Sequence, residues 1–299
     1  MNERDALRLL AADLPHAGDD CAVVDGLVLT TDMLHASTDF PAGTTSYTVG
    51  WRSVGVSLSD VAAMGAEPLG AVAAYAPTAL EEEPLVDFLE GARDVCDRVG
   101  TDYVGGDLDT HRELTVTSTA VGRTDDPVPR SGTSPGDAVC VTGEWGRTAA
   151  ALDLFDAGDV ERANELFRFE PRIEAGRALA ATATAMMDSS DGLARSLHQL
   201  AAASDCGFRI DADALPVHPE LENLSTDPET RFERAVHVGE DFELVCTLPN
   251  SAVAAAREDC PVPLTLVGRV TDPGEGVTVV GGPGEADSRP LPDRGYTHE

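Results

Sequence analysis

The dipeptide Asp25-Gly26 constrains the folding of this chain more than any other short stretch. It stands between two apolar runs, and an Asp-Gly pair in that setting is the strongest local signal for a two-residue β-hairpin turn, because both turn residues need a positive φ. In this register Val24 faces Leu27. The sequence therefore predicts an antiparallel strand pair near the N-terminus.

The open end of this predicted hairpin gathers carboxylates. Continuing the register places Asp20 opposite Thr31. It also places Asp19 opposite Asp32, and like charges directly opposed on neighbouring strands destabilise the pair. A hard cation such as Mg²⁺ would offset the repulsion, because it takes oxygen ligands, usually alongside substrate phosphates. The alternative is a pair of solvated strand ends in a very acidic protein, and the hairpin alone leaves both open.

The overall charge of the chain limits its partners. The 299 residues include 53 acidic and 21 basic residues, which give a net charge of −32, and every basic residue is arginine. Nucleic acid and anionic membranes both need a basic face, so neither is expected as a partner. The hydrophobic fraction of 42% is enough for a sizeable core, and the length allows one large domain or two of ordinary size.

The absence of lysine removes several kinds of site. A Walker P-loop, a protein-kinase site and a Schiff-base site each need a lysine. Any phosphate chemistry here must therefore use metal ions, arginine, backbone N–H groups and helix N-termini.

Two features that report on location favour the cytoplasm. No stretch approaches the ~20 apolar residues of a membrane span, and the polar start over residues 1–5 does not resemble a signal peptide. The six cysteines are scattered without a CxxC pair, so we interpret them as reduced, buried side chains rather than zinc ligands or disulfides.

The apolar periodicity predicts two domains. Residues 1–122 follow a ββαβαββ order after a short amphipathic helix over 5–14, which indicates an α+β domain with a mainly antiparallel sheet. After the hairpin, the expected elements are a helix over 51–65, a strand over 69–76, a helix over 85–99 and strands over 103–104 and 113–121.

The second half repeats this kind of pattern. Residues 123–135 contain three prolines and are interpreted as a linker, and residues 136–299 as an α/β domain. The expected strands are 138–142, 185–187, 208–211, 243–248 and 264–270, and the expected helical regions are 145–155, 160–183, 193–203 and 251–258. Residues 212–242 are interpreted as an acidic, proline-containing stretch, and the tail from Pro273 as mostly loop.

Four further acidic motifs accompany the predicted elements. Asp60 lies near the C-terminal end of its helix, where the helix dipole disfavours a carboxylate, and this favours a metal role over a surface charge. The motif at 188–191 joins a strand end to a helix start, so it gathers acids, hydroxyls and free backbone N–H groups. The other two motifs are Gly-Gly-Asp at 105–107 and Gly-Glu-Asp at 239–241. Taken singly, each motif also has a plain explanation as a cap, a turn or a solvated acid.

In this order the motifs resemble the thiamine-monophosphate kinase family, part of the aminoimidazole-ribonucleotide synthetase-like superfamily. The resemblance runs from about residue 18 to about residue 245. The matching blocks are GDDCA at 18–22, TTD at 30–32, SLSDVAAMGAEP at 57–68, GGD at 105–107, RSG at 130–132, PGD at 135–137, DSSDGL at 188–193 and GEDFEL at 239–244.

The resemblance implies ATP as co-substrate, several Mg²⁺ ions, and a homodimer whose first-domain sheets meet. It also implies transfer of the γ-phosphoryl group of ATP to thiamine monophosphate, which gives thiamine diphosphate. The implied metal positions are Asp20, Thr30, Thr31, Asp32, Asp60, Asp107, Asp188 and Asp191, with Asp20, Asp32 and Asp191 taken as catalytic. The implied ATP contacts are Gly106, Asp107, Arg130 and Ser190, and the implied substrate contact is Glu240. Phosphoryl transfer depends mainly on positioning and charge neutralisation, so no lysine is required.

Two positions extend the substrate site with less support from the pattern. Many family members carry a histidine seven residues after the equivalent of Asp32, where this chain has Asp39. An acid there cannot donate to phosphate, but it suits the cationic thiazolium or the aminopyrimidine. Near the C-terminus, residues 295–298 resemble the family's final Gly-aromatic-x-His, which makes Tyr296 a candidate ring-stacking contact.

Two alternatives stay open at this point. One is another ATP-using enzyme of the superfamily, of the aminoimidazole-ribonucleotide synthetase kind. The other is a non-catalytic relative that keeps the acidic cluster to hold a divalent ion.

The charge itself makes a prediction, namely that this is a protein of a high-salt cytoplasm. Self-repulsion at −32 destabilises the folded state, and salt screens it, with a Debye length of ~3 Å at 1 M. We therefore expect the free energy of unfolding, measured by urea titration, to rise steeply from low salt to molar salt. Full stability at low salt would contradict this expectation.

Overall fold

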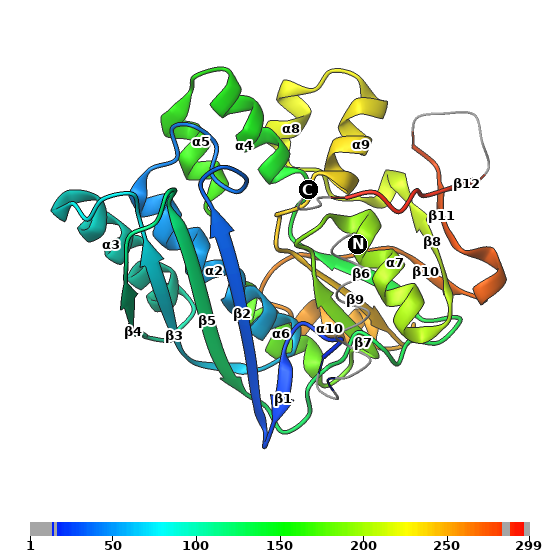
Figure 1. The fold of residues 1–299 in the computed structure, drawn as a ribbon. Helices are drawn as coiled ribbons and strands as arrows, with labels where there is room; N and C mark the ends of the chain where they lie inside the picture. Colours follow the sequence, from blue (N-terminus) through cyan, green and yellow to red (C-terminus); the bar gives the residue numbers. More distant parts are fainter. Residues whose placement is uncertain (1–13, 15–16, 283–287, 296–299) are drawn as a thin grey trace.

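Two β-sheets with flanking helices make up the structure (Figure 1), a computed structural model that describes residues 14, 17–282 and 288–295. The five-stranded sheet of the first half has the order β1-β2-β5-β3-β4, and β3 and β4 are its parallel pair. Its elements are β1 (Ala22–Val24), β2 (Leu27–His35), α2 (Ser46–Ala63), β3 (Glu67–Ala76), α3 (Glu82–Arg98), β4 (Tyr103–Leu108) and β5 (Thr115–Arg123). This confirms the ββαβαββ order. The helix predicted over 5–14 lies outside the described residues, apart from Leu14.

The hairpin turn forms as predicted, but its strands are shorter than the register suggested. Asp25 and Gly26 have φ values of 51° and 78°, and Val24 pairs with Leu27. The ladder between β1 and β2 ends at Ala22, which pairs with Leu29. The predicted pairs of Asp20 with Thr31 and of Asp19 with Asp32 are therefore wrong. On its other edge the long strand β2 pairs along its whole length with β5, where Asp32 lies opposite Ser118.

Helices α2 and α3 cover one face of this sheet (Figure 1), and they cross at two glycines. A Cβ on Gly50 would lie 2.0 Å from the carbonyl oxygen of Phe88, and a Cβ on Gly91 would lie 2.0 Å from that of Tyr47. The helix backbones therefore touch at this crossing, which seats α2 deep in the molecule.

The opposite face of the sheet has no helix packed on it in Figure 1. Large apolar side chains lie on this uncovered face: Leu29, Met33, Leu69 and Val104 are 44%, 55%, 40% and 64% exposed. We refer to it below as the open face.

The second half forms a seven-stranded sheet of order β12-β11-β8-β10-β6-β9-β7. Its strands are β6 (Ala138–Thr142), β7 (Ala185–Asp188), β8 (Gly207–Asp211), β9 (Leu244–Leu248), β10 (Leu264–Thr271), β11 (Val277–Val280) and β12 (Arg289–Pro290). Its α-helices are α4 (Arg147–Asp156), α5 (Val160–Phe167), α6 (Ile173–Ala180), α7 (Leu193–Ser204), α8 (Pro219–Leu224), α9 (Pro228–His237) and α10 (Val253–Asp259), and two short 3₁₀ turns lie at 212–214 and 273–275. The two-domain α/β architecture is thus confirmed, while the boundaries at 122 and 136 stay a prediction.

Helices α8 and α9 lie in the stretch that the sequence analysis left without structure. Both begin with proline in the first turn, and Asp227 caps α9 by accepting from the Thr230 N–H. Proline at the first helical position and an Asp cap are signals for the start of a helix. Signals for both helices were therefore present in the sequence and were overlooked.

The two halves join along α2, which contacts both α6 and β7 of the second half. None of the helices in the described part of the chain is long and apolar enough to cross a membrane.

A substitution that adds a single methyl group tests the close crossing of α2 and α3. We expect Gly91→Ala to lower the free energy of unfolding by about 1–3 kcal/mol, because the added Cβ overlaps the Tyr47 carbonyl and forces the helices apart. Urea unfolding at high salt measures the change. Gly274→Ala is the matched control, since nothing lies within 4 Å of its added Cβ. Equal stability of the two variants would contradict the crossing.

Candidate functional site

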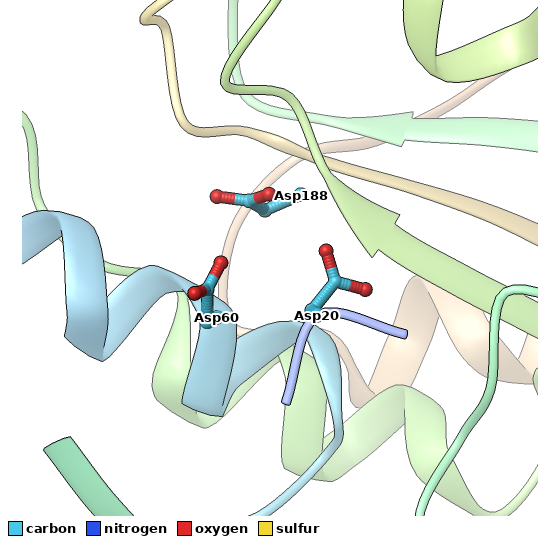
Figure 2. A group of neighbouring side chains, drawn as sticks. All are labelled: Asp20, Asp60 and Asp188. Carbon is cyan, nitrogen blue, oxygen red and sulfur yellow. The ribbon is translucent and has the colours of Figure 1, made fainter. Parts of the chain in front are cut away.

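Three aspartates meet where the two halves of the chain join (Figure 2). One carboxylate oxygen from each of Asp20, Asp60 and Asp188 lies within 4.8 Å of the others. Asp20 comes from the loop before β1, Asp60 from the last turn of α2 and Asp188 from the end of β7. Asp20 and Asp188 are buried, and Asp60 is partly buried. We call these three residues the acidic cluster.

Hydroxyl groups hold the carboxylates in place. Thr30 on β2 donates to Asp60 at 2.5 Å, and Ser59 on α2 donates to Asp188 at 2.6 Å. Two residues along β2 from Thr30, Asp32 accepts from Ser57 of α2 at 2.7 Å. Each bond joins different elements, so the site is positioned by tertiary packing rather than by one loop.

The cluster is electrostatically strained. Burial, followed by the charges of Asp32 and Asp188, raises the pKa of Asp60 well above its usual range. Burial and then the charge of Asp20 raise the pKa of Asp188 to about 8. Both shifts mean that the ionised forms lack counter-charge. A divalent cation would supply it, and three converging carboxylates are the hard oxygen donors that Mg²⁺ binds, so the residues fit this ion.

Arg130 supplies the positive charge beside the cluster. Its Nε and Nη2 donate to the two oxygens of Asp20 at 3.2 and 2.8 Å, in the two-point geometry typical of arginine. Its backbone N–H donates to Asp19 at 2.7 Å. Burial lowers the pKa of Arg130, but Asp20 and the other cluster carboxylates raise it by more, so the side chain stays charged. Asp19 and Asp20 thus both bind Arg130, which explains why neither pairs with β2.

Two predicted residues follow β7 and lie outside the cluster. Ser190 is exposed, and Asp191 lies 3.9 Å from Arg195 with its side chain 33% exposed. Both belong to the loop at 189–192 that leads into α7, two and three residues after Asp188. They are near the cluster in the chain but are not among its three converging acids.

Three other predicted residues face away from the cluster. Thr31 is next to Thr30 on β2 and therefore points to the opposite face of the sheet, where it donates to the Ser118 carbonyl at 2.8 Å. Gly106 and Asp107 lie within β4, at the far edge of the sheet. The sequence analysis placed a turn or a ligand contact there. Instead, Gly106 is needed by strand pairing, because its Cβ would lie 1.8 Å from the Ala73 carbonyl oxygen.

The position of Asp107 follows from the register. It pairs with Ala74 of β3, and Ala74 pairs with Thr117 of β5. Thr117 in turn pairs with Met33 of β2, so Asp107 lies three strand spacings, about 14 Å, from β2. Side chains aligned across strands share a face, which places Asp107 on the open face with Met33. Within one chain it cannot reach the acidic cluster.

The loop that carries Glu240 lies beside the loop after β7. The Glu240 N–H donates to the Ser190 carbonyl at 2.6 Å, and the Phe242 N–H donates to the Ser189 carbonyl at 3.2 Å. Glu240 and Phe242 have φ values of 57° and 52°, which are costly for side chains other than glycine and gather at functional sites. Glu240, the predicted substrate contact, is therefore held in an unusual backbone conformation beside the loop that follows Asp188.

The last two predicted substrate residues have different outcomes. Asp39 is buried and accepts from the His35 N–H and the Thr38 hydroxyl, each at 2.7 Å, so its carboxylate closes the turn after β2. Tyr296 lies outside the described residues.

The polar residues that support the site were not predicted from the sequence. Ser57 and Ser59 lie in a matching block, but their roles depend on which strand α2 faces. Arg52 is 2% exposed and pairs with Glu240 at 3.0 Å. A lone basic residue in an otherwise apolar helix was the available signal for it.

Comparisons with known proteins identify relatives of both halves of the chain. The family model of the AIR synthase related protein N-terminal domain matches residues 18–124, and that of the C-terminal domain matches residues 134–281. Thiamine-monophosphate kinase of Halobacterium salinarum is 57% identical over 298 residues, with 100% of both chains covered. The enzyme of Methanospirillum hungatei is 40% identical and covers 100% of this chain and 99% of its own.

Solved structures of related proteins also superpose on this chain. The structure called AaThiL, complexed with AMPPCP and TMP, superposes with a TM-score of 0.87 at 28% identity, with 100% of this chain and 97% of that chain covered. Thiamine-monophosphate kinase from Stenotrophomonas maltophilia gives a TM-score of 0.78 at 31% identity, with 92% and 94% covered. The match in both halves, together with the predicted motifs, shows that this chain belongs to the thiamine-monophosphate kinase family of AIR synthase related proteins.

Proposed function

We propose that this protein transfers the γ-phosphoryl group of ATP to the phosphate of thiamine monophosphate, which gives thiamine diphosphate and ADP. The acidic cluster carries the proposal, because three carboxylates with crowded charges converge at the junction of the two halves, as the binding of a divalent cation requires. A relative with the same fold is complexed with the ATP analogue AMPPCP and TMP, which supports both substrates.

The acidic cluster would hold Mg²⁺, with Asp32, Asp191 and the Thr30 hydroxyl as further ligands around it. When bound, the ion supplies the positive charge that lets two anionic phosphates approach each other. The protein's own part is to fix the ligands. Ser57, Ser59 and Thr30 already do so, through the bonds to Asp32, Asp188 and Asp60.

Arg130 is the proposed ATP contact, and Ser190 accompanies it at the start of α7. In the described structure Arg130 neutralises Asp20. Its side chain is 23% exposed, so the guanidinium can also present donors to a phosphate oxygen. Asp20, Asp32 and Asp191 are the acids that we propose to be catalytic, in the sense that they touch the groups that hold the reacting phosphates.

Glu240 is the proposed substrate contact, with Asp39 and Tyr296 as further candidates. Glu240 and Asp39 are acids, which suit a cationic thiazolium. Phe169 and Phe242 stack with a centroid distance of 4.1 Å, and both rings are buried, so they support the loop that carries Glu240 from inside the protein.

A homodimer completes the proposal. The open face presents the apolar residues Leu29, Met33, Leu69 and Val104, an uncovered patch that suits a second copy. Thr31 and Asp107 lie on the same face, and we propose that Gly106 and Asp107 serve the site of the partner copy across sheets that meet there. That arrangement would account for the distance of Asp107 from the acidic cluster within one chain.

The remaining parts of the proposal concern organisation and location. We assign residues 1–122 to the ATP- and metal-binding domain, 123–135 to the linker and 136–299 to the domain that completes the site. The six cysteines are all free and buried, which supports a reducing, cytoplasmic location.

Turnover tests the function directly. Purified protein with ATP, Mg²⁺ and thiamine monophosphate at high salt is expected to form thiamine diphosphate, measured by chromatography. We expect Asp32→Asn to reduce kcat by at least about a hundredfold while the urea midpoint stays close to that of wild type, because it removes a charge and not the fold. The exposed Asp259→Asn is the control. Turnover only with a formylglycinamidine-type substrate would favour the related synthetase, and ion binding without turnover would favour a non-catalytic relative.

The dimer has its own test. Met33→Glu on the open face should give a monomer by light scattering and lose activity, whereas Leu224→Glu, which is 42% exposed on α8, should leave a dimer. Mixing inactive Asp60→Asn and Asp107→Asn chains should restore about a quarter of wild-type activity, because half of the dimers then hold one intact site. No recovery on mixing would mean that Asp107 does not serve the partner's site.

A further inference from the structure

Arg52 is a buried cation to which the proposed reaction gives no part. It lies in the second turn of α2 with 2% exposure. Burial lowers its pKa, while the charges of Glu240, Asp39 and Asp241 raise it. A buried charge is retained at a cost in stability unless it is paired and hydrogen-bonded, so its partners indicate what it does.

Both ends of its guanidinium are engaged. Nη2 pairs with Glu240 at 3.0 Å, and Nη1 donates to the Phe167 carbonyl at 2.6 Å. The cationic plane also lies 3.6 Å from the ring centroid of Phe167, and 5.3 and 5.6 Å from those of Phe169 and Phe242. Arg52 therefore contacts Glu240 and three buried aromatic rings at the same time.

The loop that Arg52 contacts needs to be held. Glu240 and Phe242 have positive φ values, and the residue between them, Asp241, is anchored to the start of α4. The Asp241 carboxylate accepts from the Gly146 N–H at 2.7 Å and the Thr148 N–H at 2.8 Å. These two hydrogen bonds fix the middle of the loop. The side chain of Glu240 is fixed from the other side, by Arg52.

Helix α2 links this contact to the acidic cluster. Arg52 and Ser59 are seven residues apart, which is close to two turns, so they lie on one face of the helix about 10 Å apart. Ser59 donates to Asp188 of the cluster, and Arg52 pairs with Glu240. One helix face therefore sets the spacing between the cation end and the substrate end of the site.

We propose that Arg52 is a positioning residue that orients Glu240 to receive the organic part of the acceptor substrate, while the buried aromatic rings hold the guanidinium in place. The proposal rests on the proposed function, because it assigns Glu240 to the acceptor and not to ATP. Arg52 makes no contact with substrate itself and acts through Glu240. Because α2 is rigid, it keeps the Arg52–Glu240 contact at a fixed distance from the acidic cluster.

The test separates the two substrates kinetically. We expect Arg52→Gln to raise the KM for thiamine monophosphate by about tenfold or more while the KM for ATP changes by less than about twofold. Glu240→Gln should do the same. The double variant should be no worse than the more affected single variant, because residues that act through one contact are not additive. Arg52→Lys keeps the charge but loses the two-point geometry, and should recover part of the loss.

A matched control separates positioning from stability. Arg172→Gln breaks another buried ion pair, Arg172 with Glu243, three residues from Glu240. It should lower the urea midpoint as Arg52→Gln does, yet leave the KM for thiamine monophosphate close to wild type. Equal rises in both KM values, multiplied effects in the double variant, or the same KM change in Arg172→Gln would overturn the proposal. Absence of turnover in wild type would instead overturn the proposed function.

Discussion

Repulsion among buried carboxylates is the constraint on which the rest of this structure depends. Oxygens of Asp20, Asp60 and Asp188 converge within 4.8 Å, away from bulk water, and the raised pKa values of Asp60 and Asp188 show the cost. Such a cluster does not assemble unless other contacts hold it. Threonine and serine hydroxyls donate to it, Arg130 neutralises one member, and its three acids come from separate elements that pack tightly for other reasons.

Helix α2 bears most of that positioning. Its glycine crossing with α3 seats it against the sheet, its serines reach Asp32 and Asp188, and it packs on β7 of the second half. Because a helix is stiff over its length, residues at its two ends keep a constant separation. The acidic cluster and Glu240 therefore cannot move independently, which would suit a reaction whose rate depends on bringing two phosphates into line.

The sequence was informative where local chemistry decides and misleading where partners compete. Asp25-Gly26 fixes its turn by backbone preference alone, and the apolar spacing around Val54 and Leu58 fixes a buried helix. The outward pairing of Asp19 with Asp32 failed because Arg130 binds Asp19 and Asp20, which supplies the counter-charge that the hairpin lacked. That partner is not visible from within the hairpin. The family motifs located the three cluster acids, but only the strand register showed that Asp107 faces away from them.

The exclusive use of arginine is consistent with how the buried cations bind. Arg130 engages both oxygens of Asp20, and Arg172 engages both oxygens of Glu243. Arg52 spans Glu240 and the Phe167 carbonyl. Each of these contacts uses two donors of one planar group, which fixes the direction of the acid as well as its charge. An ammonium group would supply the charge without that direction. In a chain with 53 acidic residues, a cation of either kind would find an acidic partner. What arginine adds at these positions is the fixed direction of its hydrogen bonds.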